Sequence, residues 1–341
     1  MGRTALLLVL GLGAAFGVIG INLRNSGNAA TEHQVGYHKY ASARNLARTA
    51  VHARLRAIDR GESLTGRSDG SFNGGTFYTT VDTLSTVDTI AMNAYSQFAE
   101  STYTMRLKLY RYSKPFPVPT AAVGIRATPV NFKMQGSAVI DGRDHDPNGA
   151  LTGNPGLPGV AVMTGTDSTT VMNNGGSTKI TGTPKVAVDT TTSNPLDYVQ
   201  EYLNNYDYRY TQADSPINSN ITWGSADDPK IVVCYTPDTT VSVKFNGNCE
   251  GWGILVVHGN LNLAGTFTWH GLVIAYGDES VIQVSASVGT PKIYGALIMS
   301  GGPGSSFEMK GNVSMNYSSQ ALQQARWIKK LLAYRIMEWY E

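Results

Sequence analysis

The first sixty positions of the chain combine two different hydrophobic patterns. Residues 4–21 contain no charged side chain and are apolar almost throughout. Residues 29–60 are polar overall, but apolar side chains recur every three or four positions, the spacing of one buried helix face. The 18 residues of the first segment would rise about 27 Å as a helix, close to the hydrocarbon thickness of a bilayer. The pattern predicts one long helix over residues 1–60, membrane-spanning at its start and amphipathic afterwards. Its amphipathic stripe consists of Ala43, Leu46, Ala47, Ala50, Val51, Leu55 and Ile58.

A secretory signal peptide is the alternative to a membrane anchor. Its apolar region would be shorter and a small-residue cleavage site should follow, but residues 22–25 offer none. Positive charge also lies after the span: residues 24–60 hold seven Arg or Lys against two acidic side chains, and only Arg3 precedes. Because cytoplasmic flanks normally carry the Lys and Arg, either Met1 is the start of a processed chain or the orientation is reversed. Both explanations stay open.

A period-two alternation follows the helix. After a Gly, Ser and Asp-rich linker at residues 61–75, strand-like runs occupy residues 76–82, 87–92 and 103–112. In the last run, apolar and charged side chains alternate cleanly. The pattern predicts an antiparallel meander over residues 61–115 that buries the apolar stripe of the helix.

Glycines recur every six residues in the C-terminal half, with one miss at Gln283, and β-branched and aromatic runs lie between them. Short strands separated by evenly spaced glycines predict the stacked rungs of a β-solenoid over residues 116–317. A compact β-sandwich is the alternative. Within this region, residues 195–210 have the pattern of an inserted amphipathic helix. The periodic glycines are Gly247, Gly253, Gly259, Gly265, Gly271, Gly277, Gly289, Gly295 and Gly301.

The last segment, residues 318–341, is expected to be a helix that Ser318 or Ser319 caps. The predicted fold class is therefore α+β: a long N-terminal helix, an antiparallel meander, a β-solenoid-like domain and a terminal helix. The apolar side chains on or near one face of the terminal helix are Leu322, Ala325, Ile328, Leu332 and Trp339.

Composition narrows the class of protein. Of the 341 residues, 42% are apolar and only 15% are charged, while Gly, Thr, Ser and Asn are abundant, which is typical of exported β-rich proteins. The net charge of +2 argues against nucleic acid as a partner. Cys234 and Cys249 are the only cysteines, and an even pair in an exported region predicts one disulfide. Two free buried thiols are the alternative.

One loop has the beginning of a calcium-binding pattern. Asp144, Asp146 and Asn148 match the opening D-x-D-x-N-G, in which alternate oxygens converge on a hard cation. The twelfth position is Pro155 instead of a bidentate Glu, so any calcium here would be structural. An Asx-rich turn is the alternative, because Asp and Asn hydrogen-bond their own backbone.

Catalytic chemistry has no sequence signal. The six histidines show no metal-ligand spacing, and His258 and His270 are expected to face solvent on the rungs. No nucleophile elbow, P-loop or dinucleotide fingerprint occurs. The chain is therefore predicted not to be an enzyme, with no catalytic residues and no cofactor beyond the possible calcium.

Several phrases, in their order along the chain, resemble the type IV pilin-like superfamily and most closely its PilX-type minor pilins. They are the charge-free run from Thr4, ARNLARTAVHARLRAID, GGTFYTTV, IDGRDHDPNG, GWGILVVHGNLNLAGTFTWHGLVI and MNYSSQAL. Two features depart from the family pattern. The Gly-Phe cleavage junction of the family is not visible, and the fifth position, where the mature family helix has Glu, is Ala5 if Met1 is the mature start.

The resemblance implies a structural subunit of a type IV pilus-like filament, held in the inner membrane before assembly and extracellular afterwards. Its partners would be further copies of the chain and the pilus assembly machinery. The alternative is a membrane-anchored exported β-solenoid protein that binds or acts on polysaccharide, although residues 254–299 offer it only Asp278, Glu279 and Lys292 as charged groups. The side chains expected to pack in the filament core are Ala5, Leu6, Leu8, Leu10, Gly13, Phe16 and Ile19.

Overall fold

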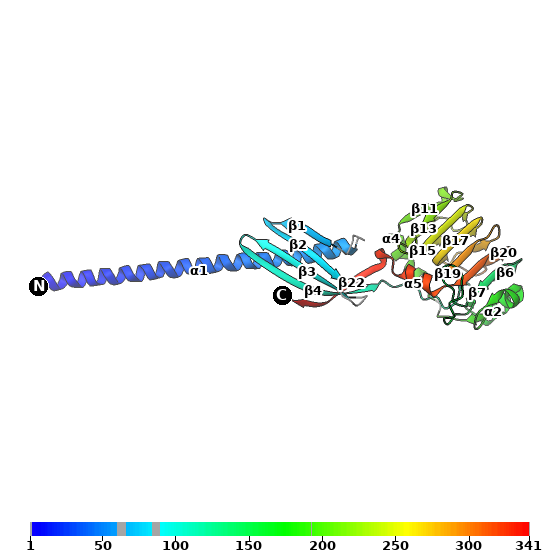
Figure 1. Ribbon diagram of the computed structural model, residues 1–341, viewed down its shortest axis with the longest axis horizontal. Coiled ribbons are helices and arrows are strands. Elements are labelled where there is room, and N and C mark those ends of the chain that lie inside the picture. The colour runs from blue at the N-terminus through cyan, green and yellow to red at the C-terminus, as the bar shows by residue number, and fades with distance from the viewer. Residues whose placement is uncertain (1, 60–65, 84–88, 192, 341) are drawn as a thin grey trace. The chain divides into compact units, whose positions relative to one another are not determined.

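The computed structural model describes residues 2–59, 66–83, 89–191 and 193–340 (Figure 1). Side chains of residues 2–6, 59 and 83 lie outside the description. The protein is α+β, as the sequence predicts, with a long apolar helix, an antiparallel sheet and a large parallel-sheet domain. It consists of two compact units, Met1–Tyr112 with Ala333–Glu341, and Ser113–Leu332.

The first unit is built on helix α1, Gly2–Asp59, which is continuous over 58 residues. The side chains of its second half that recur every three or four positions pack against strands of the antiparallel sheet, and Ser96 Oγ donates a 2.6 Å hydrogen bond to the Ala43 carbonyl. This half is therefore the core layer of its own domain. Its buried apolar residues are Ala43, Leu46, Ala47, Ala50, Val51 and Ile58.

The sheet of the first unit has the order β1-β2-β3-β4-β22, and the pairs from β1 to β4 are antiparallel. Residues 66–72, expected to be a linker, form a strand, because Asn73 and Gly74 have φ of 48° and 77° and make the tight turn that favours a hairpin. The strands are β1 (Gly66–Phe72), β2 (Gly75–Thr83), β3 (Thr89–Phe98), β4 (Ser101–Ser113) and β22 (Leu332–Tyr340).

The predicted terminal helix over residues 318–341 is wrong beyond its first two turns. Helix α5 ends at Arg326, and residues 332–340 form β22 beside β4 (Figure 1). Side chains in β22 alternate between the sheet's core face, where Tyr334 and Ile336 pack, and solvent, where Met337 is 55% exposed. The N-terminal end of α5 agrees with the prediction, since Ser318 Oγ accepts a hydrogen bond from the Ala321 N–H.

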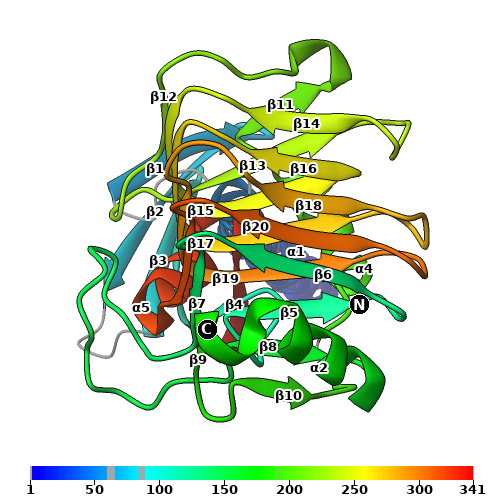
Figure 2. The ribbon, with the colours of Figure 1, turned by 90° about the vertical axis from the view of Figure 1, so that its right-hand side faces the viewer.

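The second unit is a parallel β-solenoid, and every strand pair described within it is parallel. Among the described residues, one sheet has the path β10-β8-β5-β19-β17-β15-β13-β11 and a second has the order β14-β16-β18-β20-β6. Figure 2 shows the second sheet as a stack of rungs in that order. The strands are β5 (Val123–Arg126), β6 (Asn131–Gln135), β7 (Val139–Asp141), β8 (Val160–Val162), β9 (Ile180–Thr181), β10 (Val186–Val188), β11 (Tyr208–Thr211), β12 (Ile221–Trp223), β13 (Lys230–Tyr235), β14 (Ser242–Phe245), β15 (Asn248–His258), β16 (Asn260–Leu263), β17 (Thr266–Tyr276), β18 (Gln283–Ala286), β19 (Lys292–Ser300), β20 (Ser306–Lys310) and β21 (Ser314–Tyr317).

The glycine period marks the corners of the solenoid. Gly253 pairs with Gly271, 18 residues on, and Gly271 pairs with Gly295, so the corner glycines of successive rungs stack on one another. Gly295 has φ of 145°, and a Cβ there would lie 1.9 Å from the Gly271 carbonyl oxygen. Only glycine fits such a corner. The miss at Gln283 falls in the rung between Gly271 and Gly295, which is longer by six residues.

Rung order in space differs from rung order along the chain. The chain enters at β5, in the middle of the stack, and proceeds through β8 to β10 at one end. It then returns through β11 and β13 from the opposite end, until β19 pairs with β5. Because β4 precedes and β22 follows the solenoid, the whole second unit is an insertion between two neighbouring strands of the first unit's sheet.

Two apolar layers hold the solenoid together. Aromatic rings fill its interior, among them Trp223, Trp269 and Phe307. The outer face of the large sheet is covered by α4 and α5, through side chains such as Tyr202 and Ala325. The helix predicted over residues 195–210 is shorter than expected, because β11 begins at Tyr208. The helices of this unit are α2 (Gly165–Val171), the π-helix η1 (Met172–Gly176), α3 (Ser177–Lys179), α4 (Leu196–Asn204), the 3-10 turns η2 (Gln212–Asp214) and η3 (Lys329–Leu331), and α5 (Ser319–Arg326).

Candidate functional site

The first half of α1 is an apolar surface without a cover in its own unit. Leu7, Leu8, Val9 and Leu10 are 63–69% exposed. An 18-residue window of mean hydropathy 1.8 within this helix has none of its residues buried. By length and composition alone the helix could cross a membrane, a property that signal sequences and core helices share. Large apolar side chains on all sides of a helix mean that lipid or other helices must surround it.

The predicted filament-core residues lie on this exposed half. Leu8, Leu10, Phe16 and Ile19 are 52–67% exposed, and Gly13 has open space where a Cβ would be. The side chains of Ala5 and Leu6 lie outside the described residues. The described residues of this set therefore form a free apolar surface without any chemical group that could act as an acid, base or ligand.

The predicted disulfide between Cys234 and Cys249 is wrong for this structure, in which both cysteines are free and buried. Cys234 in β13 lies opposite Val257 of β15, whereas Cys249 is eight residues earlier in β15, with the corner at Gly253 between them. Because a disulfide spans Cα atoms no more than about 7 Å apart, this register keeps the two thiols from pairing. Burial raises the pKa of both thiols, which keeps them protonated.

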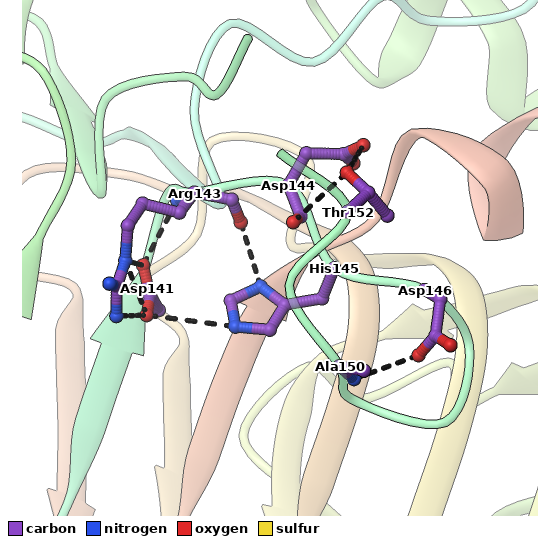
Figure 3. Close-up of polar contacts among 7 residues, drawn as sticks. All are labelled: Asp141, Arg143, Asp144, His145, Asp146, Ala150 and Thr152. Carbon is purple, nitrogen blue, oxygen red and sulfur yellow. Dashed lines mark hydrogen bonds and ion pairs between the residues drawn. The ribbon is translucent and has the colours of Figure 1, made fainter. Parts of the chain in front are cut away.

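The Asp144 carboxylate accepts hydrogen bonds from groups of the protein itself, one of which, from Thr152, Figure 3 shows. Asp144 is 1% exposed, and its carboxylate oxygens accept hydrogen bonds from Thr152 Oγ1 at 2.7 Å, Asn154 Nδ2 at 3.0 Å and the Ser319 N–H at 2.7 Å. Burial alone would raise the pKa of Asp144. The hydrogen bonds from Ser319, Thr152 and Asn154 outweigh that effect and hold the pKa below its ordinary value. Asp144 thereby anchors the loop to the start of α5.

Asp146 and Asn148 form a turn of their own in the same loop. Asp146 Oδ1 accepts hydrogen bonds from the Asn148 N–H at 2.9 Å and from the Ala150 N–H at 2.8 Å, the second of which Figure 3 shows. This is the Asx-rich turn that the sequence left as the alternative. In the part of the chain that the structure describes, no three His, Cys, Asp or Glu side chains group as metal ligands.

Two histidines expected to face solvent are buried in aromatic columns. His258 is 4% exposed and stacks on Tyr235 with ring centroids 4.7 Å apart. His270 is 6% exposed and lies 3.9 Å from the Trp252 ring. Burial lowers the pKa of His270, and the nearby Glu250 carboxylate opposes that shift. The sequence signal was present, because the in-register rungs of a solenoid place side chains of equivalent position on top of one another.

No known protein family matches this sequence, and no curated protein sequence matches it. A solved structure that is similar over 89% of this chain and 96% of its own is the competence-associated pilin ComZ from Thermus thermophilus. The two chains are 10% identical and the TM-score is 0.25. A TM-score of that size does not establish a shared fold.

Proposed function

We propose that this protein is a structural subunit of a type IV pilus-like extracellular filament. The observation that supports the proposal is the division of α1 into two halves with different surroundings. Its second half is the core layer of a folded domain, and its first half projects apolar side chains that its own unit leaves uncovered. A filament of packed N-terminal helices supplies the missing cover.

Burial of the exposed apolar half of α1 favours assembly over a subunit dispersed in water. Each large apolar side chain that leaves water contributes about 1.5–3 kcal/mol. Leu8, Leu10 and Phe16 are each at least 63% exposed. Each would have this burial energy in both states: first in the lipid bilayer, and then among the helices of other subunits. Moving from lipid to a bundle of apolar helices loses little of that energy, since packing replaces lipid contacts.

Helix packing in this filament would not depend on a buried charge. Residues 4–21 contain no carboxylate, so subunits cannot dock through an ion pair within the apolar segment. Gly13 and Gly17 have open space around them and stand four positions apart, the spacing that lets two helices approach closely. Van der Waals contact between helices is then the main attraction, and the partners are further copies of this chain and the pilus assembly machinery.

The decisive experiment is imaging of the purified full-length chain after detergent removal, by negative-stain electron microscopy. The parent should form ordered fibres. Leu8→Asp should abolish them, because an unpaired carboxylate among packed apolar helices is costly. Leu8→Met keeps size and polarity and should assemble like the parent. Fibres of normal length and number from Leu8→Asp would contradict the proposal.

A further inference from the structure

A groove lies between α4 and the outer face of the large sheet in the second unit. We call it the α4 groove. Its volume is about 350 Å³, within the size range of small-ligand sites. Side chains that recur every three or four positions along α4 form one wall, and polar and aromatic side chains from the sheet side form the other. The lining residues are Leu196, Val199, Gln200, Leu203, Arg209, Tyr235, Tyr276 and Asp278.

Tyr276 contributes a hydroxyl that no group in the described part of the chain satisfies. The residue is only 3% exposed and lines the groove, and its hydroxyl has no hydrogen-bond partner among the described residues. Burial, with a smaller contribution from Asp278, raises the pKa of Tyr276, so the hydroxyl stays neutral and can both donate and accept. A ligand in the groove can therefore hydrogen-bond to this hydroxyl in place of solvent.

Asp278 lies at the groove in a left-handed turn. Asp278 and Glu279 have φ of 42° and 70°, a left-handed conformation that Asp adopts more readily than Glu. The turn directs Asp278 Oδ2 to within 2.9 Å of His258 Nε2, and a 2.5 Å contact from His258 Nδ1 to the Thr236 carbonyl fixes the ring. The second carboxylate oxygen, Oδ1, has no partner in the described part of the chain.

Arg209 and the rings beside it complete the sheet side of the groove. The guanidinium carbon lies 5.8 Å from the Tyr206 and Tyr235 ring centroids, and the guanidinium makes no hydrogen bond or ion pair with a described residue. Its N–H donors are therefore available to a ligand. The Tyr235 hydroxyl likewise has no hydrogen-bond partner among the residues described, so donors and acceptors converge on a groove with two aromatic rings in its lining.

We propose that the α4 groove binds a neutral saccharide. A sugar ring has an apolar C–H face that packs on an aromatic ring, and hydroxyls around its edge that need both donors and acceptors. The groove supplies the half-buried ring of Tyr235, the hydroxyl of Tyr276, the acceptor of Asp278 and the donors of Arg209. Arg209 and Asp278 give the lining one charge of each sign, so its net charge favours neither an anion nor a cation. The site belongs to the second unit alone and does not depend on filament assembly.

Binding can be measured on the full-length protein by saturation-transfer NMR and calorimetry. The detergent must lack a sugar headgroup, because such a headgroup would occupy the groove. The probes are glucose, galactose, mannose and N-acetylglucosamine at millimolar concentration, with glucuronate and glucosamine as charged counterparts. At least one neutral sugar should bind saturably, and more tightly than the charged probes.

Two variants connect binding to the groove. Tyr276→Phe removes one hydroxyl and should weaken binding about tenfold, as expected for one lost hydrogen bond to the ligand. Arg209→Ala changes an exposed side chain, which leaves the fold intact, and should weaken binding similarly. Tyr294→Phe is the matched control, a 9% exposed tyrosine of the same sheet outside the groove, and should bind like the parent. Failure of all four neutral sugars to bind, or equal affinity in the parent and both groove variants, would overturn the proposal.

Discussion

The carboxylate of Asp144 joins the loop at residues 141–152 to the first turn of α5. It accepts from the Ser319 N–H and Ser319 Oγ in addition to Thr152 and Asn154. Because the folded-state pKa of Asp144 is lowered, its contribution to stability is present above the unfolded-state value of about 3.9 and is lost as the pH falls through the folded-state pKa.

Asp144→Asn should lower the free energy of unfolding by about 1–3 kcal/mol at neutral pH, because the new amide N–H groups would face donors. Chemical denaturation at a series of pH values measures the difference. The gap between the parent and the variant should narrow in acid, once the parent carboxyl is protonated. Asp227→Asn is the control, an exposed aspartate without a partner among the described residues, and should unfold like the parent. A pH-independent gap would contradict this role of Asp144.

The two cysteines give a second test at the same scale. Cys234 and Cys249 are buried and free, and burial raises the pKa of both thiols. The native protein should therefore react slowly with a thiol reagent, since the thiolate is the nucleophile. Unfolding in urea without reductant should release two reactive thiols per chain. Fewer than two reactive thiols under those conditions would support the disulfide that the sequence predicts.

Elements with a local periodicity could be predicted from the sequence. The exposed and buried halves of α1, three strands of the meander and the glycine-spaced rungs all follow from patterns within a few dozen residues. Strand β22 could not, because its partner β4 lies more than two hundred positions earlier in the chain. The spacing of Ile328, Leu332 and Trp339 fits a helix, while the alternation around Tyr334 and Ile336 fits a strand, and contact with the sheet decides between the two.

Contacts that depend on how the rungs stack also could not be predicted from the sequence. His258 and His270 are buried because the registers of β15 and β17 place them against aromatic rings of neighbouring rungs. The Asn73-Gly74 turn was a signal that could have been used, since this dipeptide is a strong indicator of a hairpin. This dipeptide therefore predicts a strand, β1, within the segment that was expected to be a linker.

The corner glycines provide the test at the scale of elements. Gly295→Ala places a Cβ 1.9 Å from the Gly271 carbonyl oxygen at a φ that alanine disfavours. We expect the variant to lose more than about 3 kcal/mol of stability or to fail to fold as a soluble protein. Thermal melting by circular dichroism measures the loss. Gly165→Ala, where nothing lies within 4 Å of the added methyl group, is the control and should melt within a few degrees of the parent. An unchanged melting temperature for Gly295→Ala would mean that the corner at Gly295 accommodates a side chain, which would contradict this role of the stacked glycines.

The whole molecule combines one small domain with a large insertion. The chain leaves the first unit after β4, builds the solenoid and returns as β22, and the backbone N–H of Lys114 bonds the Leu331 carbonyl at 2.7 Å where the two connections run together. The insertion leaves the helix and sheet of the first unit complete. The two proposed functions therefore fall on different units: assembly on α1 and ligand binding on the solenoid.

This division predicts where the chain can be cut. A chain that starts at Tyr37 lacks the exposed apolar half of α1 but keeps the stripe from Ala43 to Ile58 on the sheet. It should be soluble, monomeric and unable to form fibres. A chain that starts at Ser63 also lacks that stripe, which exposes core residues such as Met92 and Leu107. Each large side chain left uncovered costs about 1.5–3 kcal/mol, a sum comparable to the stability of a small domain.

Limited proteolysis and size-exclusion chromatography distinguish the two truncations. The Tyr37 chain should resist protease in both units, whereas the Ser63 chain should be cleaved between residues 66 and 112 while the solenoid stays intact. Sugar binding in the α4 groove should be equal in the Tyr37 chain and the full-length protein, because the groove lies within Ser113–Leu332. Fibres from the Tyr37 chain would show that surfaces other than the apolar helix drive assembly, and the proposed division between helix and solenoid would then fail.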